Sequence, residues 1–271
     1  MSNRRRKERW MALLGCVPPQ MSRSQFLEER KGLYDSYLVA AEKTVPSATI
    51  SLIKKDIERT RIVQGGAEMN NDFVQERKEA IERVLMVYAL TNKTIGYVQG
   101  MNWICAIVHY VMISGGEDAY AESLTYFCFF GIMVDMGDLF SEKMDVSALG
   151  MSGQTEAILA ILQQNDTQLY QALHDMDIFH LSAFHLRWMF LLFAGELPLS
   201  ETLCLWDRLF QERPIHRFLP FFCAAVLIQM RNQLMGRVVH DALLLLQKPK
   251  IDIQLSLKRA EKMMRKVKTN K

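Results

Sequence analysis

A glycine-rich turn that runs directly into an apolar helix carries the first residues that could do chemistry. The turn reads Ile95-Gly96-Tyr97-Val98-Gln99-Gly100-Met101-Asn102. Apolar residues then recur at one-turn spacing, which predicts a buried helix over about 101–113 with Gly100 or Asn102 as its cap. The amide of Gln99 has donors and an acceptor but no charge, so it can orient a water molecule without acting as a general base. The alternative is a turn in which Gln99 is only a structural amide.

A second candidate, Arg59, lies near the end of an earlier predicted helix. That helix begins near Ser47 or Thr49, and periodicity is lost in residues 61–66. Asp56 and Arg59 are three positions apart and are therefore neighbours on one helix face. Such a pair is usually a weak, solvated ion pair when it occurs alone. This stretch by itself therefore assigns no function.

Together, the two stretches resemble the TBC domain, the GTPase-activating module for Rab-type small GTPases. The family's first motif, I-x-x-D-x-x-R, is matched by Ile53, Asp56 and Arg59. Its second motif, Y-x-Q, is matched by Tyr97 and Gln99 and continues into Gly100, Met101 and Asn102. Other family-like positions are Trp10, Leu13, Leu14, Gly15, Phe184, Arg187, Trp188, Glu196-Leu197-Pro198, Leu205-Trp206-Asp207, Leu209 and Phe210. The resemblance covers nearly the whole chain and rests on all of these motifs occurring in order.

The resemblance implies that Arg59 is an arginine finger and Gln99 a glutamine finger, both acting on a GTPase in trans. GTP hydrolysis builds negative charge on phosphoryl oxygens and needs an aligned water molecule. A supplied arginine stabilises the charge and a glutamine amide aligns the water. Many relatives follow the arginine and threonine with an aromatic residue and a proline, where this chain has Arg61-Ile62. That departure bears on loop stiffness or GTPase preference and removes no catalytic group.

The same resemblance implies supporting roles for the residues around the two fingers. Asp56 would orient Arg59, and Thr60 would cap the end of the helix. Tyr97, Gly100 and Asn102 would brace the glutamine turn. Downstream, Trp206 and Asp207 are candidate partner contacts, although a tryptophan at helical spacing is more often a core residue.

Composition excludes several other kinds of site. The 271 residues carry a net charge of only +3, which demands neither nucleic acid nor an anionic membrane as partner. Five cysteines without a C-x-x-C pair indicate reduced thiols, and six dispersed histidines form no metal-ligand motif. No phosphate-binding loop occurs and no apolar run could span a membrane. We therefore expect no metal and no cofactor of its own, because GTP and magnesium belong to the partner GTPase.

Helical periodicity over most of the chain predicts an all-α fold with two lobes. We expect a single TBC domain over 1–271, with an N-terminal lobe (1–150) that carries both fingers and a C-terminal helical lobe (151–271). A predicted helix over 24–44 should bury Phe26, Leu33, Tyr37, Leu38 and Ala41, with Tyr34 on its flank. The basic run before Trp10 should be solvated, and Ser200 should cap a helix. The final helix, about 251–267, is amphipathic with a basic face: Lys258, Arg259, Lys262, Arg265, Lys266 and Lys268.

The expected function is activation of GTP hydrolysis by a GTP-bound Rab GTPase, so that the chain is not a hydrolase by itself. The expected location is cytoplasmic, with any endomembrane association indirect through the GTPase. Two alternatives stay open. One is a Rab-binding scaffold or effector that is catalytically weak, and the other is a helical scaffold whose basic ends bind membrane or nucleic acid.

Overall fold

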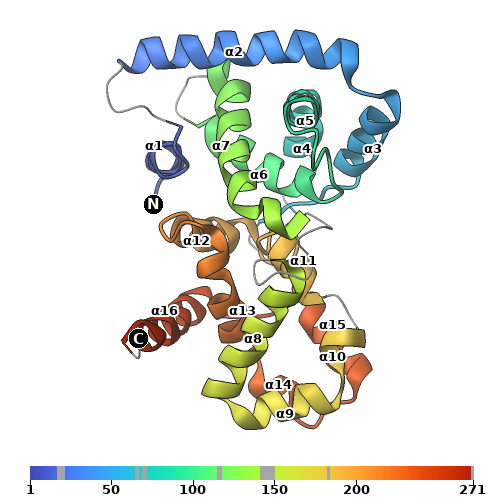
Figure 1. Ribbon diagram of the computed structural model, residues 1–271, viewed down its shortest axis with the longest axis vertical. Coiled ribbons are helices and arrows are strands. Elements are labelled where there is room, and N and C mark those ends of the chain that lie inside the picture. The colour runs from blue at the N-terminus through green and yellow to red at the C-terminus, as the bar shows by residue number, and fades with distance from the viewer. Residues whose placement is uncertain are drawn as a thin grey trace. The chain divides into compact units, whose positions relative to one another are not determined.

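The computed structural model describes residues 1–16, 22–64, 67–68, 72–114, 118–140, 150–181 and 184–269, and it is almost entirely helical, which confirms the predicted all-α fold (Figure 1). Two compact units divide the chain, Met1–Phe140 and Ser141–Lys271, whereas the sequence placed the boundary at 150. Within the described ranges, no helix combines the length and apolarity that a membrane crossing needs.

The first unit holds both candidate fingers. Its elements are α1 (Asn3–Leu13), α2 (Arg23–Thr44), α3 (Ser47–Glu58), β1 (Val63–Gln64), β2 (Ala67–Glu68), α4 (Asp72–Glu76), α5 (Lys78–Thr91), α6 (Met101–Met112), η1 (Asp118–Tyr120), α7 (Ala121–Met136) and η2 (Gly137–Phe140). The long α2 packs across α5 and α7, and α6 packs against α5 and α7 (Figure 1). Nearly every residue of α6 is buried, because this helix is apolar on all sides. The turn before α6 is therefore anchored to the core of this unit.

A two-residue antiparallel pair interrupts the helices after α3. Val63 pairs with Glu68 and Gln64 with Ala67, and these are the only strands in the described part of the chain. No strand alternation was recognised in the sequence here, since a pair this short leaves no period to detect.

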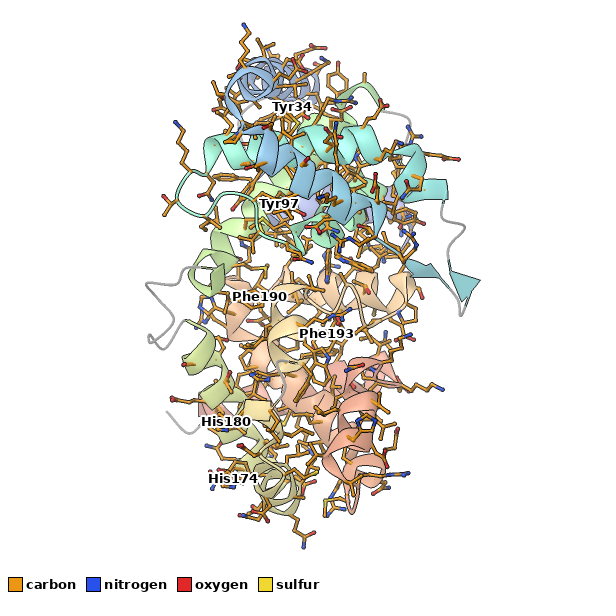
Figure 2. All side chains as sticks on the ribbon, turned by 90° about the vertical axis from the view of Figure 1, so that its right-hand side faces the viewer. Tyr34, Tyr97, His174, His180, Phe190 and Phe193 are labelled. Atoms are coloured by element: carbon orange, nitrogen blue, oxygen red, sulfur yellow. The ribbon has the colours of Figure 1, made fainter. Side chains whose placement is uncertain are left out.

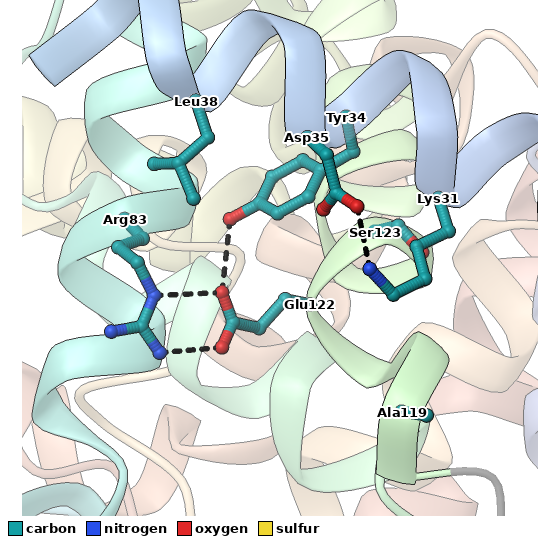
Figure 3. A pocket seen from close by; sticks show the side chains of 8 residues that line it. All are labelled: Lys31, Tyr34, Asp35, Leu38, Arg83, Ala119, Glu122 and Ser123. Carbon is teal, nitrogen blue, oxygen red and sulfur yellow. Dashed lines mark hydrogen bonds and ion pairs between the residues drawn. The ribbon is translucent and has the colours of Figure 1, made fainter.

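The inward face of α2 differs from the prediction. Leu33 is 39% exposed, whereas Tyr34, predicted as a flank, is 2% exposed. The hydroxyl of Tyr34 donates to Glu122 Oε2 of α7 at 3.2 Å, and Arg83 of α5 binds the same carboxylate through Nε at 2.9 Å and Nη2 at 2.6 Å (Figure 3). Burial and the neighbouring carboxylate raise the pKa of Tyr34. A polar network beside a pocket of about 240 Å³ thus joins α2, α5 and α7 and selects the face that α2 buries.

The basic N-terminal run is also not wholly solvated as predicted. Lys7 is 1% exposed and Arg6 is 7% exposed. The ammonium of Lys7 donates to the carbonyl of Ser114 at 3.3 Å, at the end of α6. A helix C-terminus presents free carbonyls and partial negative charge, so a buried cation is stabilised there. The sequence could not show that α1 lies against this end of α6.

The second unit consists of α8 (Met151–Asn165), α9 (Thr167–Asp175), α10 (Ile178–Leu181), α11 (Phe184–Phe190), α12 (Leu199–Leu209), η4 (Ile215–Arg217), α13 (Leu219–Gln229), α14 (Arg231–Leu234), α15 (Val239–Gln247) and α16 (Ile253–Thr269). Its centre is α13, which packs against α8 and α16. The prediction of Ser200 as a cap is wrong: Pro198 is the N-cap and α12 begins at Leu199, so Ser200 lies inside the first turn.

Candidate functional site

Arg59 lies at the C-terminal end of α3, outside a buried helix face. Ile53 and Ile57 fill that face, and Asp56 is buried with them at 4% exposure. The side chain of Arg59 is 67% exposed. Its Nε donates to the carbonyl of Lys55 at 3.0 Å, while Nη2 lies 3.6 Å from Asp56 Oδ1. The guanidinium is therefore folded back along its own helix. Because solvent screens both of these contacts, groups of a binding partner could replace them.

The turn before α6 presents Gln99 to solvent. Gly96 has φ 65° and Gly100 has φ 106°, a left-handed region that side-chain-bearing residues rarely adopt. Gly100 is also the N-cap of α6, and no side chain caps the helix there. Gln99 is exposed between these glycines. Two glycines thus turn the chain so that the amide projects from the start of a rigid, buried helix.

The hydroxyl of Tyr97 joins this turn to the end of α3. It donates to Asp56 Oδ2 at 2.8 Å and also lies 3.2 Å from Asn102 Oδ1. Burial raises the pKa of Tyr97, and the hydrogen bond to the Asp56 carboxylate raises it further. The hydroxyl therefore keeps its proton and remains a donor to Asp56 across the ordinary pH range. Tyr97 lies among the helices of the first unit (Figure 2).

Asn102 completes the connection with all of its side-chain groups. Its Nδ2 donates to the carbonyl of Asp56 at 3.2 Å and to Thr60 Oγ1 at 2.7 Å. Its Oδ1 accepts from the N–H of Gly100 at 3.1 Å and from Tyr97. Thr60 Oγ1 in turn donates to the Asp56 carbonyl at 2.9 Å. Asn102 is 2% exposed. Its buried amide therefore ties the two segments together while both its nitrogen and its oxygen are hydrogen-bonded.

The structure thus brings together six of the predicted site residues. Asp56, Thr60, Tyr97 and Asn102 form the buried connection, with the N–H of Gly100 inside it and Arg59 beside Asp56. Gln99 is exposed in the turn that these residues hold, directly before Gly100. The sequence resemblance assigned Asp56 to Arg59, but the shorter contact of its carboxylate is with Tyr97. That contact links residues 41 positions apart and could not be seen in either motif alone.

A second exposed arginine lies two residues after Arg59. The Nη1 atom of Arg61 donates to the carbonyls of Glu58 at 2.7 Å and Thr60 at 3.0 Å. Its guanidinium therefore satisfies the last carbonyl of α3, which a helix leaves without an intrahelical partner, and the carbonyl of Thr60 just beyond the helix. Arg61 therefore caps the end of α3. Arg59 instead binds one carbonyl and lies 3.6 Å from the Asp56 carboxylate.

Trp206 is not the surface residue that a partner contact requires. Its side chain is fully buried, and its indole N–H donates to the carbonyl of Leu192 at 2.9 Å. The suggestion of a partner contact for Trp206 is therefore corrected to a core role. Asp207 is partly exposed, and its carbonyl accepts a hydrogen bond from the Gln211 amide. A partner contact for Asp207 stays a prediction.

Another pair of family-like positions forms a contact that the sequence did not foresee. Arg187 Nε lies 2.7 Å from Glu196 Oε1, and the Glu196 side chain is 1% exposed. Burial raises the pKa of Glu196, while Arg187 opposes that shift. A Cβ atom on Gly195 would lie 3.0 Å from Arg187 Nη2, so glycine leaves room for the guanidinium. This pair fastens the end of α11 to the segment before α12.

Histidines and carboxylates gather at the surface of α9 and α10. His180 Nδ1 lies 2.6 Å from Asp177 Oδ1, and His174 Nδ1 lies 3.8 Å from Asp175 Oδ1 (Figure 2). Among the described residues, no three histidine, cysteine or acidic side chains converge as metal ligands would. These contacts are exposed pairs on short helices.

Known proteins resemble this chain in both sequence and fold. The sequence pattern of the Rab-GTPase-TBC domain matches residues 3–235. TBC1 domain family member 13 of Mus musculus is 33% identical over 189 residues, covering 68% of this chain and 47% of that protein. The TBC domain-containing protein C1952.17c of Schizosaccharomyces pombe is 30% identical over 230 residues, covering 78% and 37%. The chain thus spans about half the length or less of these curated relatives.

Two solved structures share the fold. The crystal structure of the Ypt/Rab-GAP domain of Gyp1p superposes with a TM-score of 0.83 at 20% identity, covering 98% of this chain and 90% of that one. The Chlamydomonas flagellar RabGAP TBC domain gives a TM-score of 0.71 at 19% identity, covering 96% and 80%. At this identity the two structures establish the shared fold.

Proposed function

The chain belongs to the Rab-GTPase-TBC domain family, and we propose that it accelerates GTP hydrolysis by a GTP-bound Rab-family GTPase with Arg59 and Gln99 as its two fingers. The observation that carries this proposal is the buried connection of Asp56, Tyr97 and Asn102. It ties together the segments that bear the two exposed side chains. Catalytic groups that act together need this kind of rigid support.

Arg59 supplies the charge that hydrolysis needs. Negative charge grows on the phosphoryl and bridging oxygens of GTP in the transition state, and a guanidinium can bind two of these oxygens at once. A supplied arginine accelerates hydrolysis by roughly 10³–10⁵-fold. Because Arg59 is folded back onto the Lys55 carbonyl in the free chain, it must leave that contact to reach the nucleotide. The contact is exposed, so leaving it costs little.

Gln99 aligns the attacking water molecule. Its amide can accept from the water and donate to a phosphoryl oxygen or a backbone carbonyl, without taking up a proton. The left-handed Gly100 and the start of α6 fix the direction in which the side chain leaves the backbone. In this proposal Gln99 replaces the switch glutamine of the GTPase. GTP and magnesium are bound by the GTPase, and this chain adds no cofactor.

This division of labour makes the chain an activator of a hydrolase rather than a hydrolase. The sequence has no phosphate-binding loop, and the proposed site offers a cation and a neutral amide, while the buried carboxylate of Asp56 accepts from Tyr97. We therefore expect no GTP hydrolysis and no tight nucleotide binding by the chain alone. Its place is the cytoplasmic surface of endomembranes, where it meets the Rab GTPase in membrane traffic.

The competing proposal is a Rab-binding scaffold or effector that does not accelerate hydrolysis. Single-turnover phosphate release, measured across a panel of GTP-loaded Rab GTPases, separates the two. We expect at least one GTPase to be accelerated by the wild type and not by Arg59→Ala. Arg23→Ala is the matched control, because Arg23 is exposed and pairs with Glu8 at 2.6 Å on another part of the first unit. Binding to GTP-loaded Rabs without acceleration of any would favour the scaffold.

A further inference from the structure

The last helix, α16, presents a basic stripe on the side opposite its packed face. The inner residues Leu257, Ala260, Met263 and Met264 are nearly fully buried, and this helix packs against α13 and α12. On the outer side, a shallow depression of about 450 Å³ is lined by Lys258, Glu261, Lys262, Arg265 and Lys266. The four cations recur at helical spacing, so they share one side of the helix. We call these four residues the α16 basic stripe.

The single acid that lines this depression is paired with an arginine of another helix, which also binds Glu212 Oε1 at 3.2 Å. Glu261 Oε1 lies 2.6 Å from Nε of Arg208 on α12, and Arg208 is also stacked on the ring of Phe218. The Glu261 carboxylate therefore forms its ion pair with Arg208 and not with a cation of the stripe. Lys258 and Lys262 make no ion pair within the described residues, and both are exposed. The stripe thus keeps a local excess of positive charge on a chain whose net charge is only +3.

An exposed aliphatic side chain accompanies these cations. Leu255 is 46% exposed and lies three and seven positions before Lys258 and Lys262, on the same side of α16. The helix contains no aromatic residue that could stack on a nucleic-acid base. Cations beside an aliphatic side chain on an exposed helix face suit the headgroup layer of a bilayer, where lysine stems lie along apolar surface while ammonium groups meet phosphates.

We propose that the α16 basic stripe binds the surface of a bilayer that contains anionic phospholipids. The apolar face of α16 stays packed in the second unit, so the helix lies against the headgroups and does not insert. Attraction of this kind is weak and reversible, and it is screened by salt. This surface would hold the chain near a membrane without the help of the GTPase, in contrast to an association made only through the partner.

Vesicle sedimentation of the full chain tests the proposal. The probes are phosphatidylcholine vesicles with and without phosphatidylserine, at low and high salt. We expect binding only to the anionic vesicles, and loss of that binding at high salt. The double variant Lys258→Gln/Lys262→Gln should weaken binding by about 30-fold, the equivalent of about 2 kcal/mol at about 1 kcal/mol for each lysine. The matched control is Lys43→Gln/Lys78→Gln, which removes two exposed lysines from α2 and α5 and should bind like the wild type.

A gain of affinity provides the opposite test. Glu261→Gln removes the acid from the depression and should strengthen binding to anionic vesicles about 5-fold. Equal binding by the two double-lysine variants would overturn the proposal, as would equal binding to neutral vesicles or stronger binding to single-stranded RNA. The proposed GTPase activation is judged separately, because Lys258→Gln/Lys262→Gln should accelerate a soluble Rab GTPase as well as the wild type does.

Discussion

The phenolic oxygen of Tyr97 lies 2.8 Å from Oδ2 of Asp56, and this one hydrogen bond joins the turn that carries Gln99 to the helix that ends at Arg59. Asp56 is buried and Tyr97 is half-buried, and burial raises the pKa of Tyr97. A charge-assisted bond of this kind is stronger than a neutral one and costly to leave unmade. The relative placement of the two proposed fingers therefore depends on a contact that neither finger makes.

Removing the Tyr97 hydroxyl tests this dependence. Tyr97→Phe leaves Asp56 Oδ2 without its donor, so we expect a loss of about 1–3 kcal/mol in the free energy of unfolding. We also expect kcat for Rab-bound GTP to fall about 10- to 100-fold, because the fingers lose alignment. Tyr110→Phe is the control, since that hydroxyl on α6 makes no hydrogen bond within the described residues. Unchanged kcat in Tyr97→Phe would mean that the connection is structural only.

Arg59 should be irreplaceable by lysine. Arg59→Ala and Arg59→Lys should each reduce GTPase activation by roughly 10³–10⁵-fold, because lysine keeps the charge but lacks the planar fork. Arg61→Ala should retain most activation, since the Arg61 guanidinium caps the Glu58 and Thr60 carbonyls. Single-turnover hydrolysis with one Rab GTPase measures all three. Full activity of Arg59→Lys would exclude the bidentate role, and loss of activity only in Arg61→Ala would move the finger to Arg61.

Gln99 should act on the hydrolysis step more than on binding. Gln99→Ala should lower kcat and kcat/KM together while the complex with the Rab GTPase still forms, as expected for an interaction made mainly in the transition state. Replacing the switch glutamine of the GTPase should then matter little. Single-turnover rates for the four combinations of wild-type and mutant partners decide this. An active Gln99→Ala together with an inert GTPase mutant would reduce Gln99 to a structural amide.

Two glycines in helices of the first unit should respond oppositely to alanine. A Cβ atom on Gly131 of α7 would lie 2.7 Å from the carbonyl oxygen of Leu14, so Gly131→Ala should cost about 1–3 kcal/mol in the free energy of unfolding. A Cβ atom on Gly32 of α2 would meet nothing within 4 Å, so Gly32→Ala should stabilise by about 1 kcal/mol through helix propensity. Urea unfolding measures both. A stable Gly131→Ala variant would contradict the close approach of Leu14 to α7.

His185 should make stability fall in mild acid. Burial lowers its pKa to about 4, and His185 Nε2 lies 3.0 Å from Thr155 Oγ1. The unfolded chain binds this proton near pH 6.5, so between about pH 6.5 and pH 4 stability should decrease by about 1.4 kcal/mol per pH unit. Glu196, whose pKa is raised, acts in the opposite direction as pH falls. The difference between wild type and His185→Gln isolates the histidine, and equal pH profiles of the two would show that His185 titrates normally.

The pattern of apolar residues was sufficient to predict where the helices lie, because the residues of a buried helix face recur with the period of the helix. The prediction succeeded over α3, α6 and α13. It was wrong about which face α2 buries, since the choice of Tyr34 over Leu33 depends on Glu122 and Arg83 from α7 and α5. It also missed the buried Lys7, whose partner carbonyl lies 107 positions away. Such polar contacts have no period along the chain.

The sequence by itself determined the family, the all-α fold and the positions of the candidate residues Arg59 and Gln99, because each belongs to a short local motif. Tertiary structure decided how the motifs are joined. The amide of Asn102 reaches the carbonyl of Asp56 across 46 positions, and Tyr97 shares its hydroxyl between these two residues. It also decided that Trp206 belongs to the core. Burial and hydrogen bonding between distant segments are properties of the packed chain, so they exist only once the helices have come together.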